Sequence, residues 1–176
     1  MNEDEIRGRN LIVDGRFPSS WKEHWSHFNG KGLARTFSDP VYGFYLMMNG
    51  EAAVKQTFDT APLTAAQLTK ASYRLRFLYE NYGDGANSKV IVRTSTGVED
   101  PIDLSGKIPE HPQAEWNPFE PYQFTVVAAD QDVDIELHGS ALGGSSGLRI
   151  TDFDVQLHLG PLVLKSVMLD ERSYEP

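Results

Sequence analysis

Alternation of apolar and polar residues is the feature of this sequence that most constrains its fold. In residues 73–80 the large apolar side chains occupy every second position, at Tyr73, Leu75, Phe77 and Tyr79. Successive side chains of a β-strand point to opposite faces of the sheet, so this pattern predicts a strand with one face in a core and the other in water.

Further segments show similar patterns, with β-branched and aromatic residues between clusters of Gly, Pro, Asn and Asp. We expect strands at residues 32–37, 42–48, 52–58, 89–94, 122–128, 133–138 and 148–159. Only residues 64–71 have a helix-like composition, and they suffice for one or two turns. The chain is therefore predicted to be all-β, folded as a two-sheet antiparallel sandwich.

The connections between these strands also carry information. Residues 81–87 are rich in Gly and Asn, which predicts a turn that joins residues 73–80 and 89–94 into a β-hairpin. Residues 101–121 contain five prolines, so we expect a long irregular loop with at most a short strand at 102–104. Long loops on rigid sandwiches often carry function.

The last expected strand changes phase along its length. Its inward residues have one parity at Leu148 and Ile150 and the other at Phe153, Val155 and Leu157. One inserted residue near Thr151 or Asp152 would place both halves in a single core, which predicts a β-bulge at that point. We also expect the opening segment, which begins at residue 10, to lie beside this final strand.

Length and charge limit the possible functions. With 176 residues the chain is predicted to be one domain: a disordered or extended segment at 1–9, a sandwich at 10–159, and an edge strand or tail at 160–176. The net charge of -9 repels phosphate and anionic head groups, which argues against nucleic acid as a partner. No run approaches the roughly 18 apolar residues that a membrane helix needs, so no membrane insertion is expected.

The sequence contains no cysteine, so no disulfide framework is expected. Its acidic N-terminus lacks the basic start and apolar centre of a secretory signal. We therefore expect a soluble protein that is cytoplasmic or exported by a non-classical route.

Motifs for catalysis are weak. Residues 143–147 match G-x-S-x-G, but a strand rather than a helix is expected to follow, so Ser145 is not predicted to be a nucleophile. No pair of carboxylates stands out for acid–base work. The chain is therefore not predicted to be an enzyme.

Polar residues on the strands suggest a binding surface instead. The candidate ligand-binding residues are Arg74, Arg76, Arg93, Glu136 and His138 on strands, with the aromatic residues Trp25, Tyr82 and Trp116 in flanking loops. If the strands form one sheet, these planar donors and carboxylates share a face and can hydrogen-bond sugar hydroxyls, while the aromatic rings stack on sugar rings. The alternative is an ordinary solvated face with loop aromatics that cap the core.

The order of short motifs resembles that of galactose-binding-like jelly rolls, similar to the non-catalytic carbohydrate-binding modules of bacterial glycoside hydrolases. The matching motifs are residues 10–17 with Trp21 for N-L-x-x-N-G-x-F-E, residues 54–58 for V-x-Q, residues 73–77 for Y-x-L-x-F, Trp116 with Phe119 and then residues 124–126 for W-x-x-F-x-F-T, and residues 154–157 for D-V-x-L. Together they cover nearly all of residues 10–159.

The resemblance implies a jelly-roll sandwich that binds a glycan or polysaccharide without catalysis, as a lectin does. It also implies a structural calcium near the first and last strands, with Asp152 and Asp154 as the metal ligands. Pro18 stands where the family usually has a glutamate that binds this calcium, which puts the metal site in doubt.

An alternative function comes from the apolar segment 162–169. A segment of this kind could donate a strand to the open edge of another chain, which would make the protein an interaction or assembly domain, either as a homo-oligomer or with a protein partner.

Overall fold

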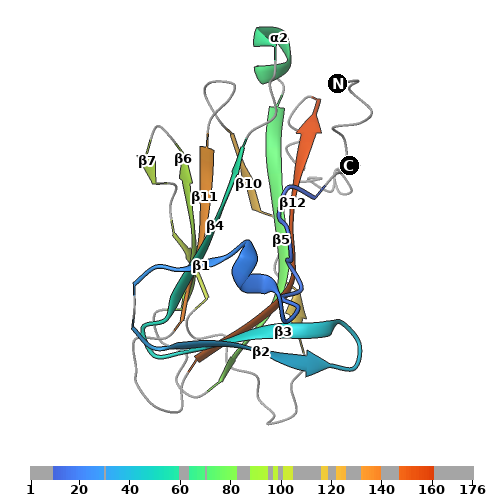
Figure 1. Cartoon of the computed structure of the whole chain (residues 1–176). Helices are drawn as coiled ribbons and strands as arrows, with labels where there is room; N and C mark the ends of the chain where they lie inside the picture. Colours follow the sequence, from blue (N-terminus) through green and yellow to red (C-terminus); the bar gives the residue numbers. More distant parts are fainter. Residues whose placement is uncertain are drawn as a thin grey trace, which may run out of the picture.

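The computed structural model describes residues 10–29, 31–59, 64–69, 71–82, 88–94, 97–98, 101–104, 116–118, 122–125, 132–139 and 147–160. Within these residues two antiparallel β-sheets form the body of the molecule (Figure 1). The helical elements described are the 3₁₀ helix η1 (Trp21–Glu23) and the single-turn helix α2 (Ala65–Leu68). The predicted all-β jelly-roll sandwich is therefore confirmed.

Sheet I contains the longest strands. Its order is β10-β5-β12-β3-β2, and β9 also pairs with β5. The bounds are β2 (Leu33–Asp39), β3 (Gly43–Asn49), β5 (Ala71–Tyr82), β9 (Asn117–Pro118), β10 (Tyr122–Phe124) and β12 (Gly147–Leu159). In Figure 1 the β2–β3 hairpin lies across the lower part of the molecule, where β3 pairs with the first residues of β12.

Sheet II forms the other layer. Its order is β1-β4-β11-β6-β7, and β8 also pairs with β6. The bounds are β1 (Ser26–His27), β4 (Ala53–Asp59), β6 (Lys89–Thr94), β7 (Gly97–Val98), β8 (Ile102–Asp103) and β11 (Asp132–His138). The short strand predicted at 102–104 is thus present as β8.

The core lies between the two sheets and follows the sequence alternation. From β5 it receives Tyr73, Leu75, Phe77 and Tyr79, and from β11 it receives Val133, Ile135 and Leu137, none of them more than 2% exposed. Burial of each large apolar side chain stabilises the fold by roughly 1.5–3 kcal/mol. The period-two pattern therefore predicted correctly which face of these two strands is buried.

The predicted hairpin of residues 73–80 and 89–94 is wrong. β5 pairs with strands of sheet I, whereas β6 pairs with β11, β7 and β8 of sheet II. The connection between them therefore crosses from one layer of the sandwich to the other. A turn-rich composition marks a reversal of the chain but does not say which sheet the next strand joins.

The predicted bulge in the last strand is confirmed. Thr151 pairs with Leu78 and Asp154 pairs with Arg76, so three steps along β12 match two along β5. Asp152, inside the bulge, has a φ of 51°. The extra residue returns the apolar side chains on both sides of the bulge to the same core.

The opening segment lies beside the final strand, as predicted. Asn10 forms an isolated antiparallel bridge with Gln156, and the Leu11 N–H donates to the Val155 carbonyl at 2.8 Å. The next residues of the segment form bends and a turn.

Two residues hold this segment against the sandwich. The side-chain amide of Gln56 accepts from the Val13 N–H at 2.8 Å and donates to the Val13 carbonyl at 2.9 Å. Gly15 packs so closely on β12 that a Cβ atom would lie 1.9 Å from the Phe153 carbonyl oxygen. Glycine is required there because of this contact rather than because of its flexibility.

The predicted terminal segments 1–9 and 160–176 fall outside the described residues, except for Gly160. Both therefore stay predictions, as does the strand-donating tail at 162–169.

Candidate functional site

A cleft lies beside the bulge in β12. Before the bulge β12 pairs with β3, and after it the segment that begins at Asn10 takes the place of β3. Between these two neighbours lies an open cleft of about 610 Å³, lined by the N-terminal segment, the β2–β3 hairpin, β5 and β12. We call this feature the bulge cleft.

Two arginine–aspartate pairs form part of its wall. Arg76 donates to one oxygen of Asp154 from Nε at 3.2 Å and also from Nη2, and Arg16 donates from Nε to Asp152 at 2.9 Å. The Arg76 and Arg16 side chains are 50% and 61% exposed. A guanidinium carries five N–H donors, so each arginine keeps donors for a ligand beside carboxylate oxygens that accept.

The backbone around the bulge cleft is also unusual. Asp14 and Asp152, which both line it, have φ values of 54° and 51°, in the left-handed region. Aspartate tolerates this region better than most residues, but the conformation is still sparsely populated. Strained backbone persists where the surrounding structure fixes it, and such positions cluster at functional sites.

Aromatic rings continue from one edge of the bulge cleft. Tyr42 lines the cleft, and its ring centroid lies 6.2 Å from that of Trp116. Trp116 lies 5.5 Å from Tyr45, which stacks on Phe37 at 5.7 Å. We call these four residues, Tyr42, Trp116, Tyr45 and Phe37, the ring row.

Hydrogen bonds hold the ring row in place. Asp39 Oδ2 accepts from the Trp116 indole N–H at 3.1 Å, and Oδ1 accepts from the backbone N–H groups of Val41 and Tyr42. Desolvation alone would raise the pKa of Asp39, but these hydrogen bonds outweigh it and lower the pKa. Asp39 is therefore an ionised anchor that joins the loop of Trp116 to the β2–β3 hairpin.

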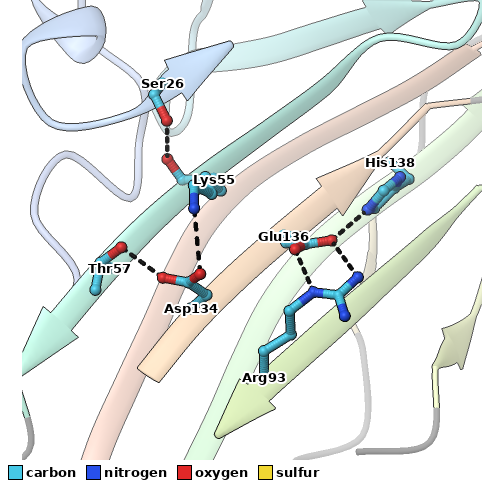
Figure 2. Close-up of polar contacts among 7 residues, drawn as sticks. All are labelled: Ser26, Lys55, Thr57, Arg93, Asp134, Glu136 and His138. Carbon is cyan, nitrogen blue, oxygen red and sulfur yellow. Dashed lines mark hydrogen bonds and ion pairs between the residues drawn. The ribbon is translucent and has the colours of Figure 1, made fainter. Parts of the chain in front are cut away.

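A second polar cluster lies on the outer face of sheet II, where Figure 2 shows its residues. Glu136 accepts from Arg93 Nε and Nη2, and its second oxygen lies 2.9 Å from His138 Nε2. Asp134 accepts from Lys55 Nζ at 3.2 Å and from the Thr57 hydroxyl. These contacts cross between β4, β11 and β6, so the cluster ties three strands together.

The Glu136 carboxylate is an unsuitable proton donor. Burial by itself would raise the pKa of Glu136, but hydrogen bonds from Arg93 and His138, together with their charges, lower it. A general acid needs a pKa near the working pH. The cluster therefore fits a structural role better than an acid–base one.

The structure divides the predicted ligand-binding residues between the two sheets. Arg74 and Arg76 lie on β5 in sheet I, whereas Arg93, Glu136 and His138 lie on β6 and β11 in sheet II. The expectation of one shared polar face is therefore wrong. Only Arg76 of these five lines the bulge cleft.

The predicted aromatic residues also separate. Trp25 is 1% exposed, packs against Phe17 and Phe153, and donates to the Val13 carbonyl, so its ring is buried away from any ligand. Trp116 belongs to the ring row and packs against Tyr42, which lines the bulge cleft. Tyr82 ends β5, and its side chain lies outside the described part of the structure.

The predicted metal ligands Asp152 and Asp154 both line the bulge cleft, but each faces an arginine rather than a shared centre. Among the described residues no group of three or more His, Cys, Asp or Glu side chains is arranged to hold a metal ion. As arranged, these two carboxylates do not fit a calcium site. The calcium that the family resemblance implies stays a prediction.

Four residues of the cleft and ring row were not predicted from the sequence: Arg16, Tyr42, Tyr45 and Phe37. A signal was present in residues 37–45, where aromatic residues lie on both sides of a turn that contains Pro40 and Gly43. Aromatic residues on a protruding hairpin cannot all reach the core, so some of them remain on the surface.

Comparisons with known proteins bear on the fold. No protein-family model and no curated protein matches the sequence. A solved structure of the xylan-binding domain CBM22-1 of Xyn10C from Paenibacillus barcinonensis matches 86% of this chain and 96% of its own, at a TM-score of 0.54 and 10% identity. This chain has the fold of carbohydrate-binding modules.

Two larger proteins contain the same jelly roll. A bacteriophage CBA120 tailspike domain matches 85% of this chain at a TM-score of 0.59 and 15% identity. An arabinose-bound α-L-arabinofuranosidase matches 86% at a TM-score of 0.57 and 10% identity. This chain spans 21% of the first chain and 27% of the second. At these identities the likeness establishes the fold of this jelly roll and nothing about its ligand.

In the part of the chain that the structure describes, no helix is both long and apolar enough to traverse a lipid bilayer.

Proposed function

We propose that this jelly roll binds neutral carbohydrate, without catalysis, in the bulge cleft. The observation that carries the proposal is the composition of the cleft: exposed guanidinium donors of Arg16 and Arg76 lie beside the carboxylates of Asp152 and Asp154, with Tyr42 at the rim. Coplanar donors and acceptors suit neighbouring sugar hydroxyls, and aromatic rings suit the apolar faces of sugar rings.

Charge favours a neutral sugar over an acidic one. The net charge of the chain is -9, and each arginine of the bulge cleft already faces an aspartate. A sugar carboxylate would have to compete with Asp152 or Asp154 for its arginine and would meet like charge. Neutral hydroxyl groups do not meet this repulsion.

The way the carboxylates are used supports the proposal of binding without catalysis. Glycoside hydrolysis needs two carboxyl groups that flank one bond, one of them as a proton donor. In the bulge cleft Asp152 and Asp154 are each turned to an arginine, and Asp14 lies 2.9 Å from His24 Nδ1. Among the described lining residues, these pairs orient the carboxyl groups toward cationic or imidazole partners rather than toward an open bond-cleaving position.

The test begins with an array of neutral and acidic glycans, followed by calorimetry on the sugars that bind. Arg76→Ala should lower the affinity about ten-fold or more, because hydrogen bonds to a charged group contribute roughly 1.5–3 kcal/mol. Arg76→Lys keeps the charge but loses the planar fork, and it should lose most of the affinity as well. Circular dichroism would check that both variants fold.

Lys31→Ala is the matched control, since Lys31 is an exposed cation in an ion pair with Glu51 and does not line the bulge cleft. Its affinity should equal that of the wild type. Unchanged binding by Arg76→Ala, a preference for acidic glycans, or release of cleaved sugar on prolonged incubation would each contradict the proposal.

A further inference from the structure

We propose that the ring row is a second binding surface that receives the part of a sugar chain emerging from the bulge cleft. The ligand is then an oligosaccharide or polysaccharide of several units rather than a single sugar. This inference rests on the proposed function and deepens it by assigning Phe37 and Tyr45, which lie outside the cleft.

The ring row joins the bulge cleft to the edge of sheet I without a break. Tyr42 belongs to both features, and from it the rings follow at centroid distances of 6.2, 5.5 and 5.7 Å to Trp116, Tyr45 and Phe37. Phe37 lies on β2, the last described strand on this side of sheet I. A chain that leaves the cleft on this side passes over aromatic rings as far as the sheet edge.

The rings are held in fixed positions before any ligand arrives. Tyr45 contacts Phe37 and Trp116, and the Arg149 guanidinium lies 5.7 Å from the Tyr45 ring centroid. Arg149 in turn donates to the Glu80 carboxylate at 3.1 Å. Side chains that are already ordered lose little conformational freedom when a ligand binds, which favours affinity.

Phe37 is the last ring of the ring row, and part of it is exposed to solvent. One of its faces stacks on Tyr45, with an angle of 21° between the rings, and the side chain is 40% exposed. The exposed part of the ring therefore presents an apolar surface to solvent. Such a surface can pack against the C–H groups on one face of a sugar ring.

A sugar chain fits this surface better than a second protein. A stable protein interface buries about 800 Å² on each partner and has an apolar centre. Here the exposed large apolar residues described on the β2–β3 hairpin are Leu33, Phe37, Val41 and Phe44, and the ring row alternates with the polar groups of Asp39 and Arg149. Rings interspersed with hydrogen-bonding groups match the two kinds of surface that a sugar presents.

The test uses three probes, the β-1,4-linked oligosaccharides of xylose, glucose and mannose, each from one to six units, with affinities measured by calorimetry. For the series that binds, the affinity should rise with chain length. Phe37→Ala should lower hexasaccharide affinity about five-fold and leave the affinity for one or two units unchanged. Tyr45→Ala should have a larger effect on the hexasaccharide.

Val41→Ala is the matched control, because Val41 is 76% exposed on the same hairpin but lies outside the ring row. It should bind every length as the wild type does. Affinity that is independent of length, or an unchanged hexasaccharide affinity in Phe37→Ala, would overturn this inference and leave the proposed function intact. Failure of every neutral sugar on the array and in the three series would remove both.

Sedimentation velocity tests whether a second copy of the chain, rather than a sugar, occupies the ring row. The wild type should have the same oligomeric state as Phe37→Ala. A dimer that becomes monomeric in Phe37→Ala while hexasaccharide affinity stays constant would show that the ring row binds a second copy of the chain, and would overturn the inference.

Discussion

Glu136 is a buried carboxylate that two neighbouring side chains hold in its ionised form. It is 5% exposed although it lies on the outer side of β11, and Arg93 and His138 satisfy both of its oxygens. Burial opposes ionisation, but these two partners outweigh it, so the pKa of Glu136 is lowered in the folded protein. A buried carboxylate that loses such partners would carry the full cost of its desolvation.

This lowered pKa predicts a loss of stability in acid. The folded protein binds fewer protons at Glu136 than the unfolded chain does, so the stabilising contribution is complete above the usual pKa and is lost as the pH falls through the folded pKa. Between about pH 5 and pH 3, the free energy of unfolding should fall more steeply for the wild type than for Glu136→Gln. Urea denaturation across this range measures the two slopes.

Glu51→Gln serves as the control for general acid effects. Glu51 pairs with Lys31 on the surface, and its side chain is 51% exposed, so the pair contributes little to stability. Parallel curves for the wild type and Glu136→Gln would show that the Arg93–Glu136–His138 contacts do not stabilise the fold.

Single residues also explain why the family resemblance predicted the fold but not the candidate site. Gln56 of the V-x-Q motif bonds the Val13 backbone, and Gly15 of the opening motif allows close contact with Phe153. Trp25, predicted to stack on a ligand, fills the core. The motifs that could be recognised in the sequence thus mainly specify packing, and packing residues are shared by proteins with different ligands.

The bulge in β12 is the element that creates the candidate site. It changes the partner of β12 from β3 to the N-terminal segment and leaves the bulge cleft between them. Its position was predictable because the parity of buried residues changes between Ile150 and Phe153. The cleft was not predictable, because it depends on the neighbours of β12, and pairing between distant segments leaves no periodic signal in the sequence.

A pair of substitutions tests the strain at the bulge. Asp152→Ala and Asp152→Asn both remove the charge that pairs with Arg16, but alanine tolerates a φ of 51° less well than asparagine does. Asp152→Ala should therefore be less stable than Asp152→Asn by about 1 kcal/mol, measured by urea denaturation. Equal stabilities would mean that the bulge relaxes to accept alanine and stores no backbone strain.

The sheet that each strand joins was harder to predict than the strands themselves. The segments that form β5 and β6 were recognised from their alternation, yet β6 lies in the opposite layer. Hydrophobic periodicity fixes which face of a strand is buried, and both layers bury one face against the same core. Because of this ambiguity, the sequence pattern did not predict that Arg76 and Arg93 lie in different sheets.

At the scale of the whole molecule the two outer faces differ in character. Sheet II carries the Lys55–Asp134 and Arg93–Glu136–His138 contacts, in which the charged groups are paired with one another (Figure 2). Sheet I carries the bulge cleft and the ring row, where hydrogen-bonding groups and aromatic rings remain partly exposed. We therefore propose that sheet I carries recognition and that sheet II provides structural support.

Nuclear magnetic resonance of the isotopically labelled protein, titrated with the neutral oligosaccharide that it binds most tightly, tests this assignment most directly. Chemical-shift changes should be largest at Arg76, Gln156 and the indole of Trp116, while Arg93 and His138 remain unchanged. Changes concentrated on the Glu136 face of sheet II, with the bulge cleft unaffected, would contradict the account.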